Sequence, residues 1–215
     1  MPGSSSNIPI DKEKIVIAGG GLVGALAASA FADAGHKVDL YELRDDPRGE
    51  GAAAGRSINL TLSHRARRAL RRIGMEQECL DAGVPLFGRM IHRYDGSTYD
   101  VPYGRTDEHY ILSISRLGLN QMLLTGYFTS FPFHKVNNHI AAEKRENVNL
   151  HFEHRVTSVD LKGQLTFKSG DTAQGDVLIG ADGAFSKVRA QMARGRFDFQ
   201  QHYIPHGYKG NFFGL

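Results

Sequence analysis

A glycine-rich turn near the start of the chain has the residue spacing that binds a dinucleotide. Gly19, Gly21 and Gly24 form the pattern G-x-G-x-x-G directly after the apolar run KIVIA, residues 14–18. The first glycine permits a tight turn, the second lets the backbone approach a pyrophosphate, and the third lets a helix pack closely on the strand. Glu42 follows 18 residues after Gly24, near the expected position of the acid that binds an adenosine ribose. These residues predict a dinucleotide site, and the motif alone leaves FAD and NAD both open.

Two other interpretations of this stretch are weaker. Residues 15–32 contain no charge and approach the lower length limit of a membrane-spanning helix. Three consecutive glycines near the start would weaken such a helix by about 1 kcal/mol each. The other alternative is a fortuitous glycine-rich turn with a solvated Glu42. A buried strand, a tight turn and a buried helix explain the same residues better.

Few other side chains combine into a reactive group. Cys79 is the only cysteine, which excludes an intramolecular disulfide and a cysteine-based zinc cluster, and we expect it to be buried. His151 and His154 are three residues apart in an expected strand, where that spacing places them on opposite faces and argues against a metal site. No nucleophile elbow surrounds the adjacent Ser63 and His64, which argues against a hydrolase. We therefore expect no metal and no catalytic side chain.

The charge of the chain gives no electrostatic footprint for nucleic acid. Among 215 residues, 26 Lys and Arg oppose 23 Asp and Glu, so the net charge is only +3. Five arginines lie in residues 64–73, but Ala66, Ala69, Leu70 and Ile73 fall on one helical face. We interpret this segment as an amphipathic surface helix capped by Ser63. With 41% apolar residues, the chain can bury a core.

The elements that must position the glycine turn alternate between strand and helix. We expect strands at 14–18 and 36–42 around a helix at 22–34, then a loop at 45–55, an extended segment at 56–62 and helices at 64–73 and 76–83. From Leu86 the pattern changes to strands, beginning with a hairpin that turns at Asp95-Gly96. Further strands are expected at 110–116, 148–154, 155–160, 164–168 and 176–179. A second strand-turn-helix follows, with Asp182 in its turn and a helix at 185–193, and it predicts another contact with the nucleotide.

One combination of motifs resembles a known family. GGGLVG, YELR, GRSINLTLSHRARRAL, RMIH, VPYG, YILSISR and IGADGAFSKVR are together similar to the kynurenine 3-monooxygenases, which are FAD-dependent aromatic hydroxylases. The glycine turn and GADG are shared by flavin hydroxylases in general, whereas RSINLTLSHR and RMIH are more particular. The resemblance covers residues 14–208. It implies an α/β fold, with a Rossmann-like FAD-binding domain and an interleaved β-rich substrate-domain segment, incomplete in this chain.

The resemblance also implies which residues contact the ligands. The residues implied to contact FAD are Gly19, Gly21, Val23 and Gly24 at the pyrophosphate, Tyr41, Glu42, Leu43 and Arg44 at the adenosine half, Thr61, Arg116 and Val156 along the rest of the flavin, and Asp182 at the ribityl–phosphate region. Arg89 and Tyr103 would bind the amino-acid end of L-kynurenine. An arginine on a sheet face can hold a carboxylate in a two-pronged hydrogen bond, although a plain surface arginine is the alternative.

The implied reaction is the hydroxylation of L-kynurenine to 3-hydroxykynurenine with NADPH and O2. NADPH reduces the flavin, and a flavin C4a-hydroperoxide then transfers oxygen to the ring, so the chemistry belongs to the cofactor. The family implies the mitochondrial outer membrane, whereas this chain shows no anchor, which leaves a cytosolic location open. The alternative is a non-catalytic product that binds nucleotide weakly or associates with the full-length enzyme. A further alternative, an NAD-dependent dehydrogenase, needs a His or Lys acid-base group that the sequence does not identify.

Two segments depart from the family pattern. Residues 126–140 interrupt an expected helix and contain Pro132, which predicts an inserted segment, with a genuine loop extruded by the fold as the alternative. The family continues well beyond residue 208 with a second flavin-wrapping motif, so we expect this chain to be a poor or inactive hydroxylase. The expected division is a flexible terminus at 1–13, FAD-binding parts at 14–84 and 116–193, a β-rich substrate-domain segment at 85–115, and the start of the substrate domain at 194–215.

Overall fold

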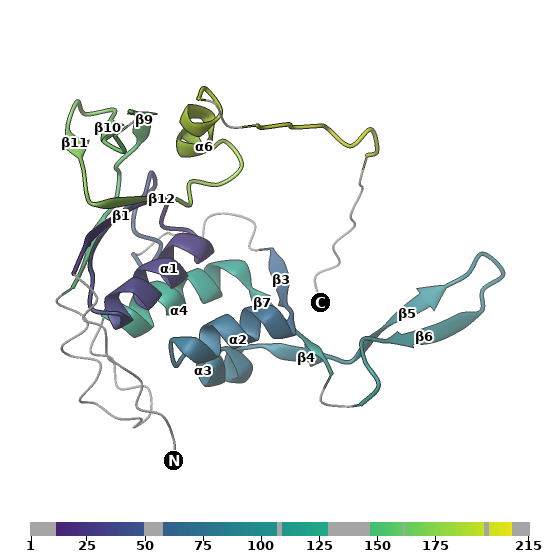
Figure 1. Ribbon diagram of the computed structural model, residues 1–215. Helices are drawn as coiled ribbons and strands as arrows, with labels where there is room; N and C mark the ends of the chain where they lie inside the picture. Colours follow the sequence, from purple (N-terminus) through teal and green to yellow (C-terminus); the bar gives the residue numbers. More distant parts are fainter. Residues whose placement is uncertain are drawn as a thin grey trace, which may run out of the picture.

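A parallel sheet of four strands forms the centre of the fold. The computed structural model describes residues 12–49, 58–106, 109–128, 147–160, 162–195 and 198–207. The strands stand in the order β12 (Val177–Gly180), β1 (Lys14–Ala18), β2 (Lys37–Tyr41) and β8 (Val148–His151), and all neighbours are parallel (Figure 1). The side chains of residues 15–18 in β1 are fully buried because layers cover both faces of the sheet. The prediction of two parallel strands leading into the glycine turn and the GADG turn is confirmed, and β1 is buried as expected. The expected burial of the second strand is wrong, because β12 is an edge strand whose side chains are only partly buried.

Helices cover one face of this sheet. Helix α1 (Leu22–Asp33) packs its alanines, among them Ala28 and Ala32, against Ile15 and Ile17 of β1. Small side chains let the helix approach the sheet closely. The predicted glycine at the end of this helix is confirmed, since Gly35 adopts a left-handed φ of 91° just after it. Helix α4 (Arg116–Phe128) lies beside α1.

A small antiparallel sheet covers the opposite face. It contains β11 (Thr172–Ala173), β10 (Leu165–Phe167) and β9 (Val156–Val159), and helix α6 (Lys187–Met192) lies next to it (Figure 1). Leu165 and Phe167 pack against Val16 and Ala18, whose side chains alternate with those of Ile15 and Ile17 along β1. Strand β1 therefore lies in the middle layer of three, between the helices and the small antiparallel sheet. The sequence predicted β9 and β10 but not the two-residue strand β11.

A second antiparallel sheet joins segments from the middle of the chain. Strands β3 (Asn59–Leu62) and β4 (Val84–Leu86) both pair antiparallel with β7 (Ile111–Ser115). Helices α2 (His64–Arg72) and α3 (Glu76–Ala82) pack against this sheet through Leu70 and Cys79. The amphipathic interpretation of α2 is confirmed by the burial of Leu70. Ser63 stands at the N-cap of α2, but its side chain makes no capping hydrogen bond, which corrects the expected cap.

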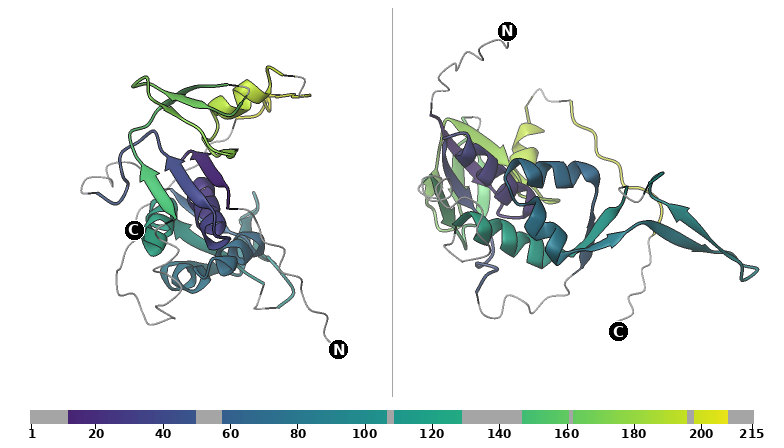
Figure 2. Two further views of the ribbon diagram at one scale, coloured as in Figure 1. Left: turned by 60° about the vertical axis from the view of Figure 1, so that its left-hand side comes forward. Right: turned by 90° about the horizontal axis from the view of Figure 1, so that it is seen from below.

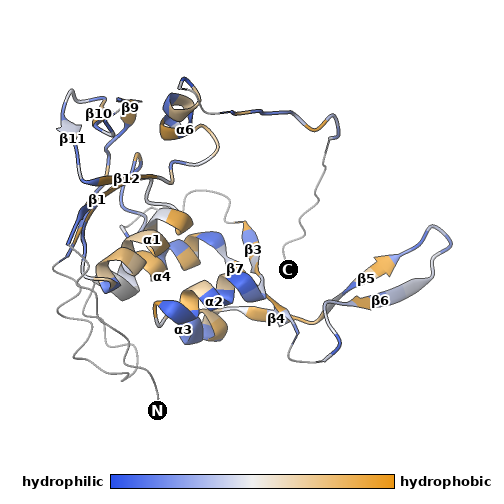
Figure 3. Ribbon diagram, viewed as in Figure 1, coloured by the Kyte–Doolittle hydropathy of each residue, from blue (hydrophilic) through white to orange (hydrophobic). Residues whose placement is uncertain are grey.

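A two-stranded hairpin projects from the rest of the molecule. Strands β5 (Gly88–His92) and β6 (Thr98–Pro102) pair with each other alone among the described strands, and Figure 1 and the right-hand view of Figure 2 show them extending away from the helices. The predicted turn at Asp95-Gly96 is confirmed, with Gly96 at a φ of 83°. Apolar residues on the hairpin remain in solvent, and Met90 is 56% exposed (Figure 3).

Several predicted segments fall partly or wholly outside the described residues. Most of the loop at 45–55, the flexible terminus at 1–13 and the end of the chain beyond 207 lie there. Helix α4 continues through Phe128, three residues into the segment 126–140 that is predicted to be an insertion. Residues 129–146 lie outside the described residues, and the insertion itself stays a prediction. No helix in the described parts of the chain is long and apolar enough to cross a membrane.

Candidate dinucleotide-binding site

The three motif glycines differ in what surrounds them. Gly19 has a left-handed φ of 104°, and a Cβ there would overlap the carbonyl of Ala181 at the end of β12. A Cβ at Gly24 would overlap the carbonyl oxygen of Gly19. A Cβ at Gly21, in contrast, would meet no atom within 4 Å. The turn therefore packs tightly against the end of β12 and against its own backbone, whereas it is open at Gly21. This shape admits a pyrophosphate.

The electrostatics of this turn favour an anion. Gly21 is the N-cap of α1, and no acidic side chain lies in the first turn of the helix. The helix end points unpaired N–H groups and a partial positive charge toward the open side. Val23, in the first turn, is 69% exposed rather than packed in the core. The local chemistry fits the diphosphate of a dinucleotide.

Glu42 connects the end of β2 to the glycine turn. Its Oε2 accepts a hydrogen bond from the N–H of Gly20 at 2.7 Å, and its Oε1 accepts one from the N–H of Arg44 at 3.0 Å. The Arg44 guanidinium lies 3.6 Å from Oε1 and is largely exposed. A carboxylate has about four acceptor positions, so room remains for ribose hydroxyls. Tyr41 is buried beneath this end of the strand, whereas Leu43 is exposed.

Asn120 on α4 also contacts the glycine turn, and sequence reasoning missed it. Its Nδ2 donates to the carbonyl oxygen of Gly20 at 3.1 Å. Arg116 begins α4 one helical turn earlier, so both side chains belong to the same face of the helix. The four-residue spacing from Arg116 was the one feature of the sequence that could have indicated a role for Asn120. The backbone N–H of Arg116 donates to the carbonyl of Ile58, which fixes the start of the helix next to β3.

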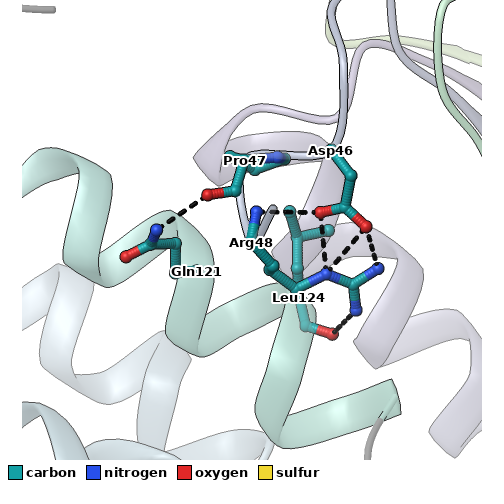
Figure 4. Close-up of polar contacts among 5 residues, drawn as sticks. All are labelled: Asp46, Pro47, Arg48, Gln121 and Leu124. Carbon is teal, nitrogen blue, oxygen red and sulfur yellow. Dashed lines mark hydrogen bonds and ion pairs between the residues drawn. The ribbon is translucent and has the colours of Figure 1, made fainter. Parts of the chain in front are cut away.

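The loop after β2 is tied to α4 (Figure 4). Arg48 binds the Asp46 carboxylate, with Nε 2.8 Å from Oδ1 and Nη2 2.5 Å from Oδ2, and its Nη1 donates to the Leu124 carbonyl at 3.2 Å. Gln121 Nε2 donates to the Pro47 carbonyl at 2.7 Å. The hydrogen bond from Arg48 lowers the pKa of Asp46 from its ordinary value. No motif in the sequence predicted these hydrogen bonds between the loop and α4.

The GADG turn lies directly against the first glycine of the motif. The N–H of Ala181 donates to the Ala18 carbonyl at 2.7 Å, which aligns the ends of β12 and β1. The Asp182 carboxylate accepts from Ser186 Oγ at 2.5 Å and from the Lys187 N–H at 2.6 Å. Ser186 is the N-cap of α6, since its hydroxyl accepts from the Arg189 N–H at 2.9 Å, and Asp182 holds this cap in place. The structure brings this turn to the glycine loop, and a contact of Asp182 with flavin stays a prediction.

The other residues implied for the flavin site lie on separate elements. Thr61 faces outward on β3, because its neighbours Leu60 and Leu62 pack against the core. It pairs with Ser113 of β7, in the strand that leads into Arg116. Val156, at the start of β9, packs against the core cluster that includes Phe167. Thr61 therefore lies beside the strand that leads into Arg116, and the Val156 side chain packs against the core.

Arg89 and Tyr103 lie on one face of the β5–β6 hairpin. Arg89 pairs with Val101, and the N–H of Tyr103 donates to the Phe87 carbonyl at 2.8 Å, so Arg89 and Tyr103 are diagonal neighbours across the ladder. Both side chains are exposed. Because the hairpin extends away from the glycine turn, the structure brings these two residues to each other but not to the dinucleotide site (Figure 1).

The expected separation of His151 and His154 is wrong. Strand β8 ends at His151, but the N–H of His154 still donates to the Glu42 carbonyl at 2.8 Å. Glu153, with a φ of 61°, is therefore an extra residue in the path of the strand, and both rings contact Tyr41. Their ring centroids lie 5.7 Å apart. Strand alternation does not apply beyond the end of the strand. No group of three or more His, Cys, Asp or Glu side chains within the described residues has a metal-binding arrangement.

Cys79 and two arginines of α2 have roles within the fold. Cys79 is buried in the core, as predicted, and burial raises its thiol pKa to about 11, so it remains a protonated thiol at neutral pH. In the basic helix α2, Arg67 and Arg71 both bind the carboxylate of Glu76, at 3.3 Å and 2.5 Å. Part of the positive charge of this helix is therefore balanced within the chain.

Comparisons with known proteins agree with this geometry. Residues 12–207 match the family described as FAD binding domain. A kynurenine 3-monooxygenase of Anopheles gambiae is 42% identical over 207 residues, which cover 93% of this chain and 39% of that protein. The enzyme of the same name from Sus scrofa is 42% identical, covering 93% and 40%, and that of Myxococcus xanthus is 38% identical, covering 92% and 41%. The chain spans about two-fifths of the length of these curated relatives.

Solved structures share the fold at lower identity. The 2-methyl-3-hydroxypyridine-5-carboxylic acid oxygenase superposes with a TM-score of 0.64 at 22% identity, covering 85% of this chain and 43% of that one. PqsL of Pseudomonas aeruginosa, described as a probable FAD-dependent monooxygenase, gives 0.60 at 22% identity, covering 91% and 48%. At this identity these structures establish the fold alone. The chain belongs to the FAD-binding domain family, and over most of its length it is similar to the kynurenine 3-monooxygenases.

Proposed function

We propose that this chain supplies the FAD-binding part of a monooxygenase that hydroxylates L-kynurenine to 3-hydroxykynurenine, with NADPH as reductant and O2 as co-substrate. The observation that carries the proposal is the glycine turn, which is packed at Gly19 and Gly24 and open at Gly21, next to an uncapped helix N-terminus. The substrate is inferred from the names of the relatives at 37–42% identity. The same relatives lead us to propose association with the mitochondrial outer membrane.

The roles of the residues follow from where they lie. N–H groups at the start of α1 would bind the diphosphate, and Glu42 would accept hydrogen bonds from the adenosine ribose. Arg89 would bind the carboxylate of kynurenine in a two-pronged hydrogen bond, with the Tyr103 hydroxyl as a second contact. FAD, when bound, supplies the redox and oxygen-transfer chemistry. The chain binds and orients FAD and substrate.

The absorption spectrum of the purified chain tests the cofactor. After FAD is added and the free flavin is removed by desalting, a retained flavin spectrum is the expected result. A folded chain that retains no flavin contradicts the proposal that these residues suffice for FAD binding. The Asn149→Leu variant, altered on the far edge strand β8, serves as a control that should retain flavin equally.

A second candidate function is nucleotide binding without turnover, or association with a longer relative. It is favoured by the hairpin, whose strands β5 and β6 leave outer edges unpaired among the described residues and expose apolar side chains. Kynurenine-dependent oxidation of NADPH, with analysis of the product, separates the two. Formation of 3-hydroxykynurenine supports the monooxygenase, and retained flavin without product supports the second candidate.

A further inference from the structure

We propose that Asn120 is a positioning residue for the diphosphate of the dinucleotide and that it acts through the peptide between Gly20 and Gly21. The proposal rests on the proposed binding of FAD and deepens it by naming the group that holds the glycine turn in its binding-competent orientation. Asn120 comes from α4, a helix that lies outside the strand-turn-helix motif of the glycine turn.

Gly20 is held from both sides by side chains of different elements. Its N–H donates to Oε2 of Glu42 at 2.7 Å, and its carbonyl oxygen accepts from Nδ2 of Asn120 at 3.1 Å. Both hydrogen bonds are partly buried, so water competes with them less than it would at the surface. One bond fixes the peptide before Gly20, and the other fixes the peptide after it.

The bond from Asn120 sets the direction of the next donor. In a trans peptide the C=O and N–H groups point in opposite directions. Because the Gly20 carbonyl points to α4, the Gly21 N–H points away from α4. Within the described segments no acceptor bonds this N–H, and a Cβ at Gly21 would meet nothing within 4 Å. This unbonded donor lies at the positive end of α1, in the part of the turn that is open at Gly21, where an anionic diphosphate would bind.

The glycines themselves do not hold this orientation. A peptide flanked by Gly20 and Gly21 can rotate with little steric cost, because neither residue has a Cβ. In the rotated state the Gly20 carbonyl oxygen would replace the Gly21 N–H on the open side and would repel a phosphate. The conformational freedom that lets the turn approach the ligand thus creates the need for an external hydrogen bond, and Asn120 supplies it.

Binding measurements on Asn120→Leu test this inference, because leucine has a similar shape and no donor. The control is Asn149→Leu, the same substitution at a residue of β8 whose amide binds Asp39 at 2.8 Å. Flavin fluorescence reports FAD affinity, and competition against FAD reports the affinities of ADP and adenosine. We expect N120L to weaken FAD and ADP about ten-fold, the effect of losing one hydrogen bond to a charged group, and to leave adenosine unchanged. Equal weakening of adenosine, or unchanged ADP affinity, would overturn the proposal.

A measurement without ligand separates this inference from the proposed function. In the wild type and in N149L, the backbone order parameter of the Gly21 amide should lie near the rigid value of about 0.85, and in N120L it should fall toward about 0.6. An unchanged order parameter in N120L contradicts the positioning role even if FAD binds. A wild-type chain that binds neither FAD nor ADP, yet shows the drop in N120L, contradicts only the proposed function.

Discussion

The parallel sheet and the β5–β6 hairpin carry the two halves of the expected chemistry, and they are supported very differently. Strand β1 is buried on both faces and hydrogen-bonded to neighbours on both sides. The hairpin strands pair only with each other among the described residues, and Met90 and Tyr99 are largely exposed. An isolated two-stranded hairpin is at best marginally stable in water. The glycine turn is therefore supported by other segments of this chain, whereas Arg89 and Tyr103 lie on a hairpin that pairs with no other described strand.

The difference has a functional consequence. A binding site needs side chains held in place by packing and by hydrogen bonds from neighbouring groups. Around the glycine turn Glu42, Asn120 and the Ala181 backbone provide this support. On the hairpin, Arg89 has only the backbone ladder beneath it. We therefore expect cofactor binding to depend less on additional polypeptide than substrate binding does.

The largest expected effect comes from filling the space at the motif glycines. Gly24→Ala should lower the free energy of unfolding by about 3 kcal/mol, because the new methyl group overlaps the Gly19 carbonyl and forces α1 away from the sheet. Gly21→Ala should change it by about 0.5 kcal/mol or less, since the methyl group enters open space, and should still weaken FAD binding by occupying the ligand side. Urea unfolding and FAD titration measure the two quantities. Equal destabilisation by both variants would contradict the described packing of the turn.

The next comparison uses one isoleucine in each region. Ile17→Ala in β1 should cost about 3 kcal/mol of unfolding free energy, because a fully buried side chain leaves a cavity between the sheet and α1. Ile91→Ala in β5 should cost less than about 1 kcal/mol, since that side chain is only half-buried on the hairpin. The urea midpoints of the two variants give the comparison. A cost at Ile91 similar to that at Ile17 would show that the hairpin packs against something beyond itself.

The parts of the fold that follow from local patterns were predictable. The run KIVIA, the spacing of Gly19, Gly21 and Gly24, and the turn at Asp95-Gly96 each determine a conformation within a few residues. The sequence therefore predicted the order of most strands and helices around the site. It also predicted that the GADG turn contributes near the glycine turn, which the parallel pairing of β12 with β1 explains.

The parts that depend on distant segments were not predictable in this way. Asn120 is 100 residues from Gly20, and α4 carries no motif that marks its contact with the turn. The pairing of β7 with both β3 and β4 also joins distant segments. The prediction that His151 and His154 lie on opposite faces was wrong for a local reason. The left-handed conformation of Glu153 ends the strand alternation on which that prediction depended.

The smallest expected effect compares one carboxylate in each region through acid titration. The pKa of Asp46 is lowered by the hydrogen bond from Arg48, and that of Asp95 by hydrogen bonds from the Ser97 hydroxyl and N–H, both from an ordinary value of 3.8. A lowered folded-state pKa means that each carboxylate stabilises its surroundings above pH 3.8 and that this contribution is lost as the pH falls through the lowered value. Asp46 holds Arg48, which joins the loop after β2 to α4, whereas Asp95 acts within the hairpin turn.

Asp46→Asn should therefore lower the free energy of unfolding at neutral pH and make its decline on acidification shallower. Asp95→Asn should leave the global acid dependence unchanged, because the hairpin contributes little to the stability of the sheet. Urea unfolding of both variants and the wild type, at pH values on either side of 3.8, measures the difference. If the two variants altered the acid dependence equally, the hairpin would be unfolding together with the sheet, and the two regions would form one cooperative unit.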